Sequence, residues 1–178
     1  MTGFLALDGH GFDTNPHDYD IADRALATVL AEHPDSPLAA LREGSEPLTV
    51  FLPNDGAYHR FVADSLGHRN STEAAVFADL ADSLSIDGLE ALLLQPQVVP
   101  GRTLSYRGLL RADGTGLDTL SPFERTAIEL DVRHRLLVRL KDADPDDRDP
   151  MIVRPNLNLG NRQAIHGTDA VFRIIDLP

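Results

Sequence analysis

Apolar residues recur at helical spacing through the first half of the chain. From Asp20 they fall on one face of a helix, until His33 and Pro34 end the pattern. Between the second and third helical segments, the compact apolar run at 48–52 predicts a buried strand. The helices are predicted to begin at Asp20, Ser36, Asn54 or Asp55, Asn70 and Asp87, with Pro34, Gly44, Gly67 and Pro96 as stop signals.

The second half of the chain favours strands, because apolar and polar residues alternate there. Residues 121–124 could also cap a helix that reaches residue 130, so this stretch stays open. Helices first and strands second predict an α+β fold rather than alternating βαβ units. Strands are predicted at 103–110, 127–133, 135–141, 150–153 and 169–177, with a polar loop at 154–163.

Length and composition favour a single globular domain. The chain has 178 residues, of which 42% are hydrophobic and 25% charged. Residues 1–18 show no sustained period and are predicted as an N-terminal extension, followed by one domain at 19–178. The chain has no cysteine, which excludes disulfide scaffolds, cysteine-based metal sites and thiol catalysis. We predict no cofactor and no catalytic residue.

The net charge of −12 disfavours two classes of partner. Such a surface repels nucleic-acid phosphates and anionic lipid headgroups, so neither is expected to bind. No apolar run reaches the length needed to cross a bilayer, so no membrane insertion is expected. The first basic residue is Arg24, so the chain lacks the positive start of a signal peptide. Either the protein is cytoplasmic or this chain follows a removed leader.

Three segments in order resemble the fasciclin domain family. Residues 48–61 are similar to its first signature, 92–101 to its central helix that runs into Val-Val-Pro-Gly, and 160–178 to its closing signature. The matching positions are Pro53, Asn54, Asp55, Ala57 and Tyr58, then Ile165, His166, Asp169, Val171 and Phe172. The resemblance implies a β-wedge packed against a group of N-terminal helices.

The resemblance also implies a function. It suggests a non-enzymatic adhesion or interaction module, extracellular or in the cell envelope, that binds a protein or matrix partner. Pro96 and Gln97 replace the Tyr-His pair of the family, and the chain has no Arg-Gly-Asp, so integrin-type adhesion is not carried over. A carrier of small apolar molecules is the alternative. A hydrolase is a third possibility, which would need Asp55 and His59 to approach Ser65 or Ser71.

Five residues are candidates for binding: Asn54, Asp55, His59, His166 and Asp169. Asn54 and Asp55 follow a strand and open a helix, so capping of the backbone explains both of them. His59 lies one turn beyond Asp55 and could meet it on the helix surface. In the family, the histidine that matches His166 is largely a packed core residue, and Thr168 and Asp169 are its expected partners here.

Two acidic segments raise the question of metal binding. Asp142, Asp144 and Asp146 stand at alternate positions, as in a calcium loop, but Asp147 and Val153 replace its required glycine and glutamate. A solvated turn explains 142–149 better. Residues 8–18 also gather acids and histidines, without a recognised metal-binding spacing. A flexible extension would lose conformational entropy on ordering around an ion.

Overall fold

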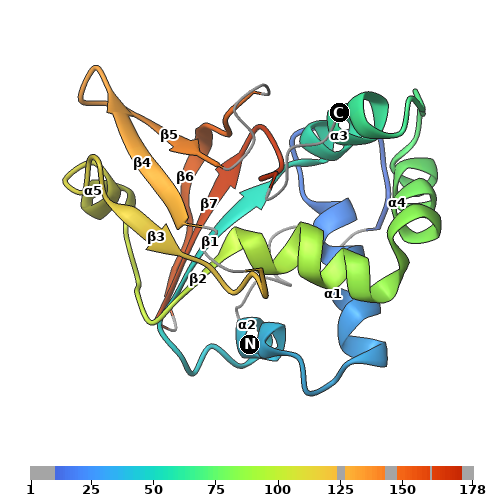
Figure 1. Cartoon of the computed structure of the whole chain (residues 1–178), viewed down its shortest axis with the longest axis horizontal. Helices are drawn as coiled ribbons and strands as arrows, with labels where there is room; N and C mark the ends of the chain where they lie inside the picture. Colours follow the sequence, from blue (N-terminus) through green and yellow to red (C-terminus); the bar gives the residue numbers. More distant parts are fainter. Residues whose placement is uncertain (1–10, 124–126, 143–147, 161, 174–178) are drawn as a thin grey trace.

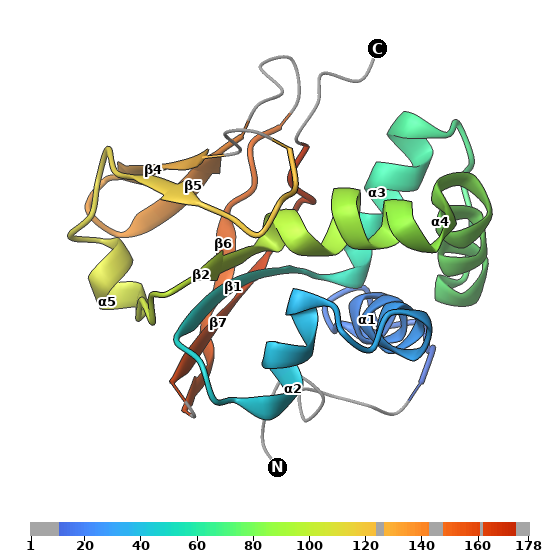
Figure 2. The ribbon, with the colours of Figure 1, turned by 60° about the horizontal axis from the view of Figure 1, so that its bottom comes forward.

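The computed structural model describes residues 11–123, 127–142, 148–160 and 162–173. Most helices gather on one side and the strands on the other (Figure 1). Turning the molecule shows β1 running between the two groups (Figure 2). The fold class is therefore α+β, as the order of helical and strand patterns predicts.

The predicted N-terminal helices are all present. They are α1 (Asp20–Glu32), the 3₁₀ turn η2 (Pro37–Ala39) with α2 (Ala40–Glu43), α3 (Asp55–Ser65), and α4 (Glu73–Gly88), which continues through the π-helix η3 (Leu89–Leu94) into the 3₁₀ turn η4 (Gln95–Gln97). Ser85 (φ 61°, ψ 175°) breaks α4 where the fifth predicted helix starts.

Several caps differ from the prediction. Asp20 is the first residue of α1 rather than its cap, and Thr72, not Asn70, accepts a backbone hydrogen bond at the start of α4. The Asn70 side chain donates to Asp79 instead. At the last helical segment, the Ser85 hydroxyl accepts from the Gly88 N–H. At these last two helix starts a neighbouring polar residue provides the cap, whereas Tyr19, which precedes α1, makes no side-chain cap hydrogen bond.

The strands form two sheets that meet along their edges. One sheet has the order β2-β1-β7-β6 and the other β3-β4-β5; β1 and β7 are parallel and the other paired strands antiparallel. Two backbone hydrogen bonds join the two sheets: the Leu140 N–H donates to the Pro150 carbonyl, and the Leu120 N–H donates to the Val98 carbonyl. The strands are β1 (Leu48–Pro53), β2 (Val98–Pro100), β3 (Gly116–Asp118), β4 (Ala127–Arg133), β5 (Leu137–Lys141), β6 (Ile152–Gly160) and β7 (Gln163–Thr168).

Two strand predictions and one loop prediction were wrong. Residues 103–110 contain α5 (Tyr106–Leu109), because the Ser105 hydroxyl accepts from the Gly108 N–H and caps a helical turn. The predicted loop at 154–163 holds most of β6, whose alternation is broken by Asn156 at φ 56°. Among the described residues the last strand is β7, before the predicted 169–177: residues 169–173 are not in a strand, and 174–177 lie outside the described residues.

The alternation of β1 separates two hydrophobic cores. Leu48, Val50 and Leu52 face the helices, whereas Phe51 points into the space between the two sheets. β7 follows the same rule, so Ile165 packs on the helical side and His166 stacks against Phe51 with ring centroids 6.0 Å apart. The helices are thus held against one face of the larger sheet.

Gly167 allows the start of α1 to approach β7 closely. A Cβ atom there would lie 2.1 Å from the Tyr19 hydroxyl and 3.1 Å from Arg154 Cβ. We expect Gly167→Ala to lower the free energy of unfolding by about 1–3 kcal/mol, measured by urea denaturation, because it overpacks a tight contact. Tyr19→Phe in that background should recover part of the loss. Gly108→Ala, which meets nothing closer than 3.6 Å, is the control; an equal loss there would contradict this account.

Candidate functional site

The N-terminal ends of α1, α3 and α4 meet around the buried side chain of Asp55. Its two carboxylate oxygens accept hydrogen bonds from the backbone N–H groups of Asp20 (3.1 Å) and Ile21 (2.9 Å). Asn54 caps α3 itself by accepting from the Ala57 N–H at 2.9 Å. The prediction that one of the two residues caps α3 is confirmed for Asn54, while Asp55 caps α1.

Residues 11–18 complete this junction. The backbone carbonyl of Pro16 accepts from the Gly56 N–H at 2.8 Å, and that of Asp18 accepts from the Asp55 N–H at 3.1 Å. The Asp13 N–H donates to the Glu73 carboxylate at 2.7 Å. These residues form no helix or strand, yet they are bonded to the first turns of α3 and α4.

The junction brings carboxylates together in the interior. Oxygens of Asp18, Asp55 and Glu73 all lie within 4.8 Å of one another, and all three residues are buried. Burial and the contact with Asp18 raise the pKa of the Asp55 carboxyl to about 9. Burial is also the largest cause of the raised pKa of Glu73. We call Asp18, Asp55 and Glu73 the acidic triad.

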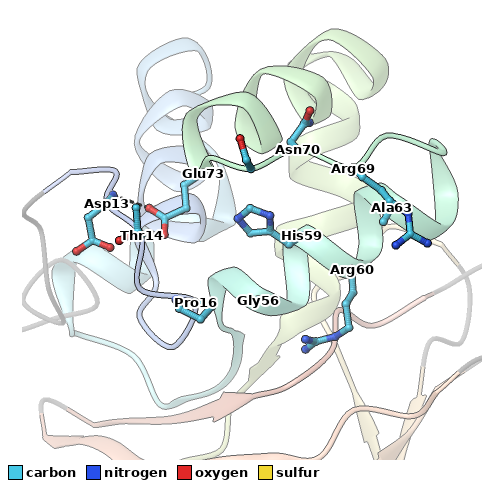
Figure 3. A pocket seen from close by; sticks show the side chains of 11 residues that line it. Asp13, Thr14, Pro16, Gly56, His59, Arg60, Ala63, Arg69, Asn70 and Glu73 are labelled. Carbon is cyan, nitrogen blue, oxygen red and sulfur yellow. Dashed lines mark hydrogen bonds between the residues drawn. The ribbon is translucent and has the colours of Figure 1, made fainter.

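A surface pocket of about 440 Å³ opens beside the triad (Figure 3). Glu73 and Asp13 lie at one end of the pocket, Arg60 and Arg69 at the other, and the His59 ring points into the space between them (Figure 3). The pocket is therefore lined by side chains of both signs of charge. Such a pocket suits charged groups better than an apolar ligand.

The residues considered for hydrolysis do not form a catalytic arrangement. Both carboxylate oxygens of Asp55 are bonded to α1, and no hydrogen bond of the His59 side chain is found within the described part of the chain. Ser71 lines the same pocket as His59, whereas the Ser65 hydroxyl is buried away from it. A histidine base needs an orienting partner and a nucleophile within hydrogen-bond reach. The described residues provide neither.

His166 is a buried, hydrogen-bonded residue, as expected, but its predicted partners were wrong. Nε2 bonds the Leu104 carbonyl at 2.8 Å, and Nδ1 accepts from the Asn156 N–H at 3.2 Å. This pair of contacts fits a neutral imidazole with its proton on Nε2. Burial lowers the pKa of His166, which favours the same form. The residue thus links β7 to β6 and to the segment before α5.

Asp169 lies near α3, away from His166's partners. Its carboxylate accepts from the Met151 N–H at 2.8 Å and pairs with Arg148, and its backbone carbonyl accepts from Arg60. Asp142 accepts from the Arg173 N–H at 2.8 Å. Asp144 and Asp146 lie outside the described residues, so the calcium interpretation of 142–149 stays an untested hypothesis.

Sequence reasoning missed Asp18 and Glu73 as members of one cluster. The helix start predicted at Asn70 does not single out Glu73, and Asp18 falls in the predicted N-terminal extension. Both lie beside a predicted helix start, as Asp55 does. Acids at several helix starts were the available signal, since helix N-termini favour negative charge. Their convergence depends on tertiary structure.

The comparisons with known proteins support the fold. No protein-family model matches this chain, and no curated protein matches it. Among solved structures, it is similar to a FAS1 domain pair from the insect cell adhesion molecule fasciclin I, with a TM-score of 0.56 and 12% sequence identity. The fold is fasciclin-like. The match covers 92% of this chain and 48% of the other, so the chain spans about half of the domain pair.

The fasciclin-like fold agrees with the β-wedge and helices that the three sequence segments imply. At this sequence identity the match concerns the fold alone. Within the described residues, no helix is both long enough and apolar enough to span a bilayer.

Proposed function

We propose that this chain is a non-enzymatic fasciclin-type adhesion or interaction module that acts outside the cytoplasm and binds a protein or matrix partner. The observation that carries the proposal is the similarity of almost the whole chain to a domain pair from a cell adhesion molecule. The lack of a catalytic arrangement around His59 in the described residues is consistent with it.

The carrier alternative finds no support in the interior of the described residues. The apolar cavity between the helices and the sheet is lined by Leu26, Val50, Tyr58 and Gln97, among others, and has a volume of about 10 Å³. Pockets for small-molecule ligands usually have volumes of roughly 300–1,000 Å³. A pigment-sized molecule would need a large rearrangement of this core.

Two measurements test the proposed function. Beads coated with the folded protein should adhere to intact cells or extracellular matrix of the source, and beads coated with the same protein after heat denaturation should not. Protease added to intact source cells should remove the native protein without lysis. Equal adhesion of both bead types, or protection until the cells are lysed, would contradict the proposal.

A further inference from the structure

The acidic triad gathers three buried carboxyl groups that pair with no basic side chain in the described part of the chain. Asp55, Glu73 and Asp18 are 0%, 2% and 6% exposed. Among the described residues, no lysine, arginine or histidine forms an ion pair with any of them. Buried charges ordinarily require a partner of opposite sign or a metal ion, because removing them from water is costly.

One oxygen in the triad also lacks a hydrogen-bond donor. Asp18 Oδ1 is fully shielded from solvent and receives no hydrogen bond. By contrast, the Asp55 oxygens accept from α1, and Glu73 Oε2 accepts from Asp13. One carboxylate oxygen of Asp18 lies within 4.8 Å of an oxygen of Asp55 and of an oxygen of Glu73. The carboxyl cluster thus contains a buried side chain with an unsatisfied oxygen, and a cation bound there would supply a positive partner.

The spacing of these oxygens fits a calcium-sized cation. Calcium binds oxygen ligands at about 2.3–2.6 Å, so two ligands on opposite sides of it are about 4.6–5.2 Å apart and adjacent ones closer. The three triad oxygens all lie within 4.8 Å of one another, which is close enough for one ion of this size to contact each of them. Asp18 also belongs to a second group with Asp13 and Asp20, within the same limit. Magnesium is less suitable, because it demands a tight octahedron and retains water.

We propose that the acidic triad, with Asp13 and Asp20 at its side, binds a calcium-type divalent cation. The carboxylate oxygens would be the ligands, and a hydrogen-bonded oxygen keeps a second lone pair for the ion. Because the ligands come from residues 11–20, α3 and α4, bound cation would tie the N-terminal segment to two helix starts. The site therefore differs from the acidic loop at 142–149.

Terbium luminescence tests this site directly. Tyr19 lies between Asp18 and Asp20 in the sequence, so a Tb³⁺ ion bound there should be sensitised by tyrosine excitation. The full chain should show saturable emission that Ca²⁺ displaces, and Ca²⁺ should raise its melting temperature relative to the chelated protein. Asp18→Asn should weaken Tb³⁺ binding at least tenfold. An asparagine amide can donate to Asp55, so this variant should fold without metal.

The control is the double variant Asp144→Asn/Asp146→Asn in the other acidic segment, measured at constant ionic strength. It should bind Tb³⁺ and Ca²⁺ as the unmodified chain does. The proposal is overturned by unsaturable emission without a calcium-dependent rise in melting temperature, by unchanged binding in Asp18→Asn, or by loss of binding in the double variant. None of these results depends on adhesion, so the proposed function is tested separately.

Discussion

Replacing Asp55 with alanine is expected to lower the free energy of unfolding by about 3–5 kcal/mol, because two buried backbone N–H groups lose their acceptor. Those groups belong to Asp20 and Ile21 in the first turn of α1, and Asp55 itself is fully buried. Urea denaturation followed by circular dichroism measures the loss. Excess chelator should be present, so that any bound cation does not contribute to the difference.

Two matched variants separate this role from general effects of losing a polar side chain. Asn54→Ala removes only the cap of α3 and should cost about 1 kcal/mol. Asp82→Ala removes an exposed carboxylate from α4 and should change stability by less than about 0.5 kcal/mol. If Asp55→Ala were no more harmful than Asp82→Ala, the carboxylate would not be the essential cap of α1.

The helices could be predicted well because their signals are local. Capping residues, stop residues and a repeating apolar face lie within a few positions of one another, and α1, α3 and α4 follow them. The strands were harder. The alternation at 103–110 is typical of a strand, but Ser105 caps a helical turn there. β6 contains a register shift around Asn156, which interrupts the alternation of apolar and polar residues, so the polar sequence of this strand predicts a loop.

The candidate site shows the same limit at the level of single contacts. The sequence indicates that Asp55 is a capping residue, but the helix it caps begins 35 residues earlier. For His166, nearby residues were expected as partners, whereas its bonds go to Leu104 and Asn156, 62 and 10 residues away. A pattern gives the chemical type of a contact; the partner depends on which elements pack together.

Replacing His166 with alanine should lower the free energy of unfolding by about 3–5 kcal/mol at pH 7.5, comparable to the effect at Asp55. The change leaves a cavity beside Phe51 and Tyr106, whose rings lie 6.0 and 6.3 Å from the imidazole. It also leaves the Asn156 N–H and the Leu104 carbonyl without their partner. His166→Gln, which can still donate to Leu104, should cost less. Equal losses in the two variants would argue against the hydrogen bond.

The pH dependence of stability identifies the imidazole more specifically. Burial lowers the pKa of His166 in the folded state, so the unfolded chain takes up the proton first. Stability should be fully retained above the unfolded pKa of about 6.5 and should fall as the pH drops from there through the folded pKa. Protonated Nδ1 would also point a donor at the Asn156 N–H.

The effect of His33 on the pH dependence of stability has the opposite sign. Its hydrogen bond to Glu90 raises its pKa, so the stability that it contributes is lost as the pH rises. A plot of the free energy of unfolding against pH, between pH 8 and 5, should therefore fall less steeply toward acid for His166→Gln than for the unmodified chain, and more steeply for His33→Gln. Identical plots for His166→Gln and the unmodified chain would assign the acid sensitivity to other groups.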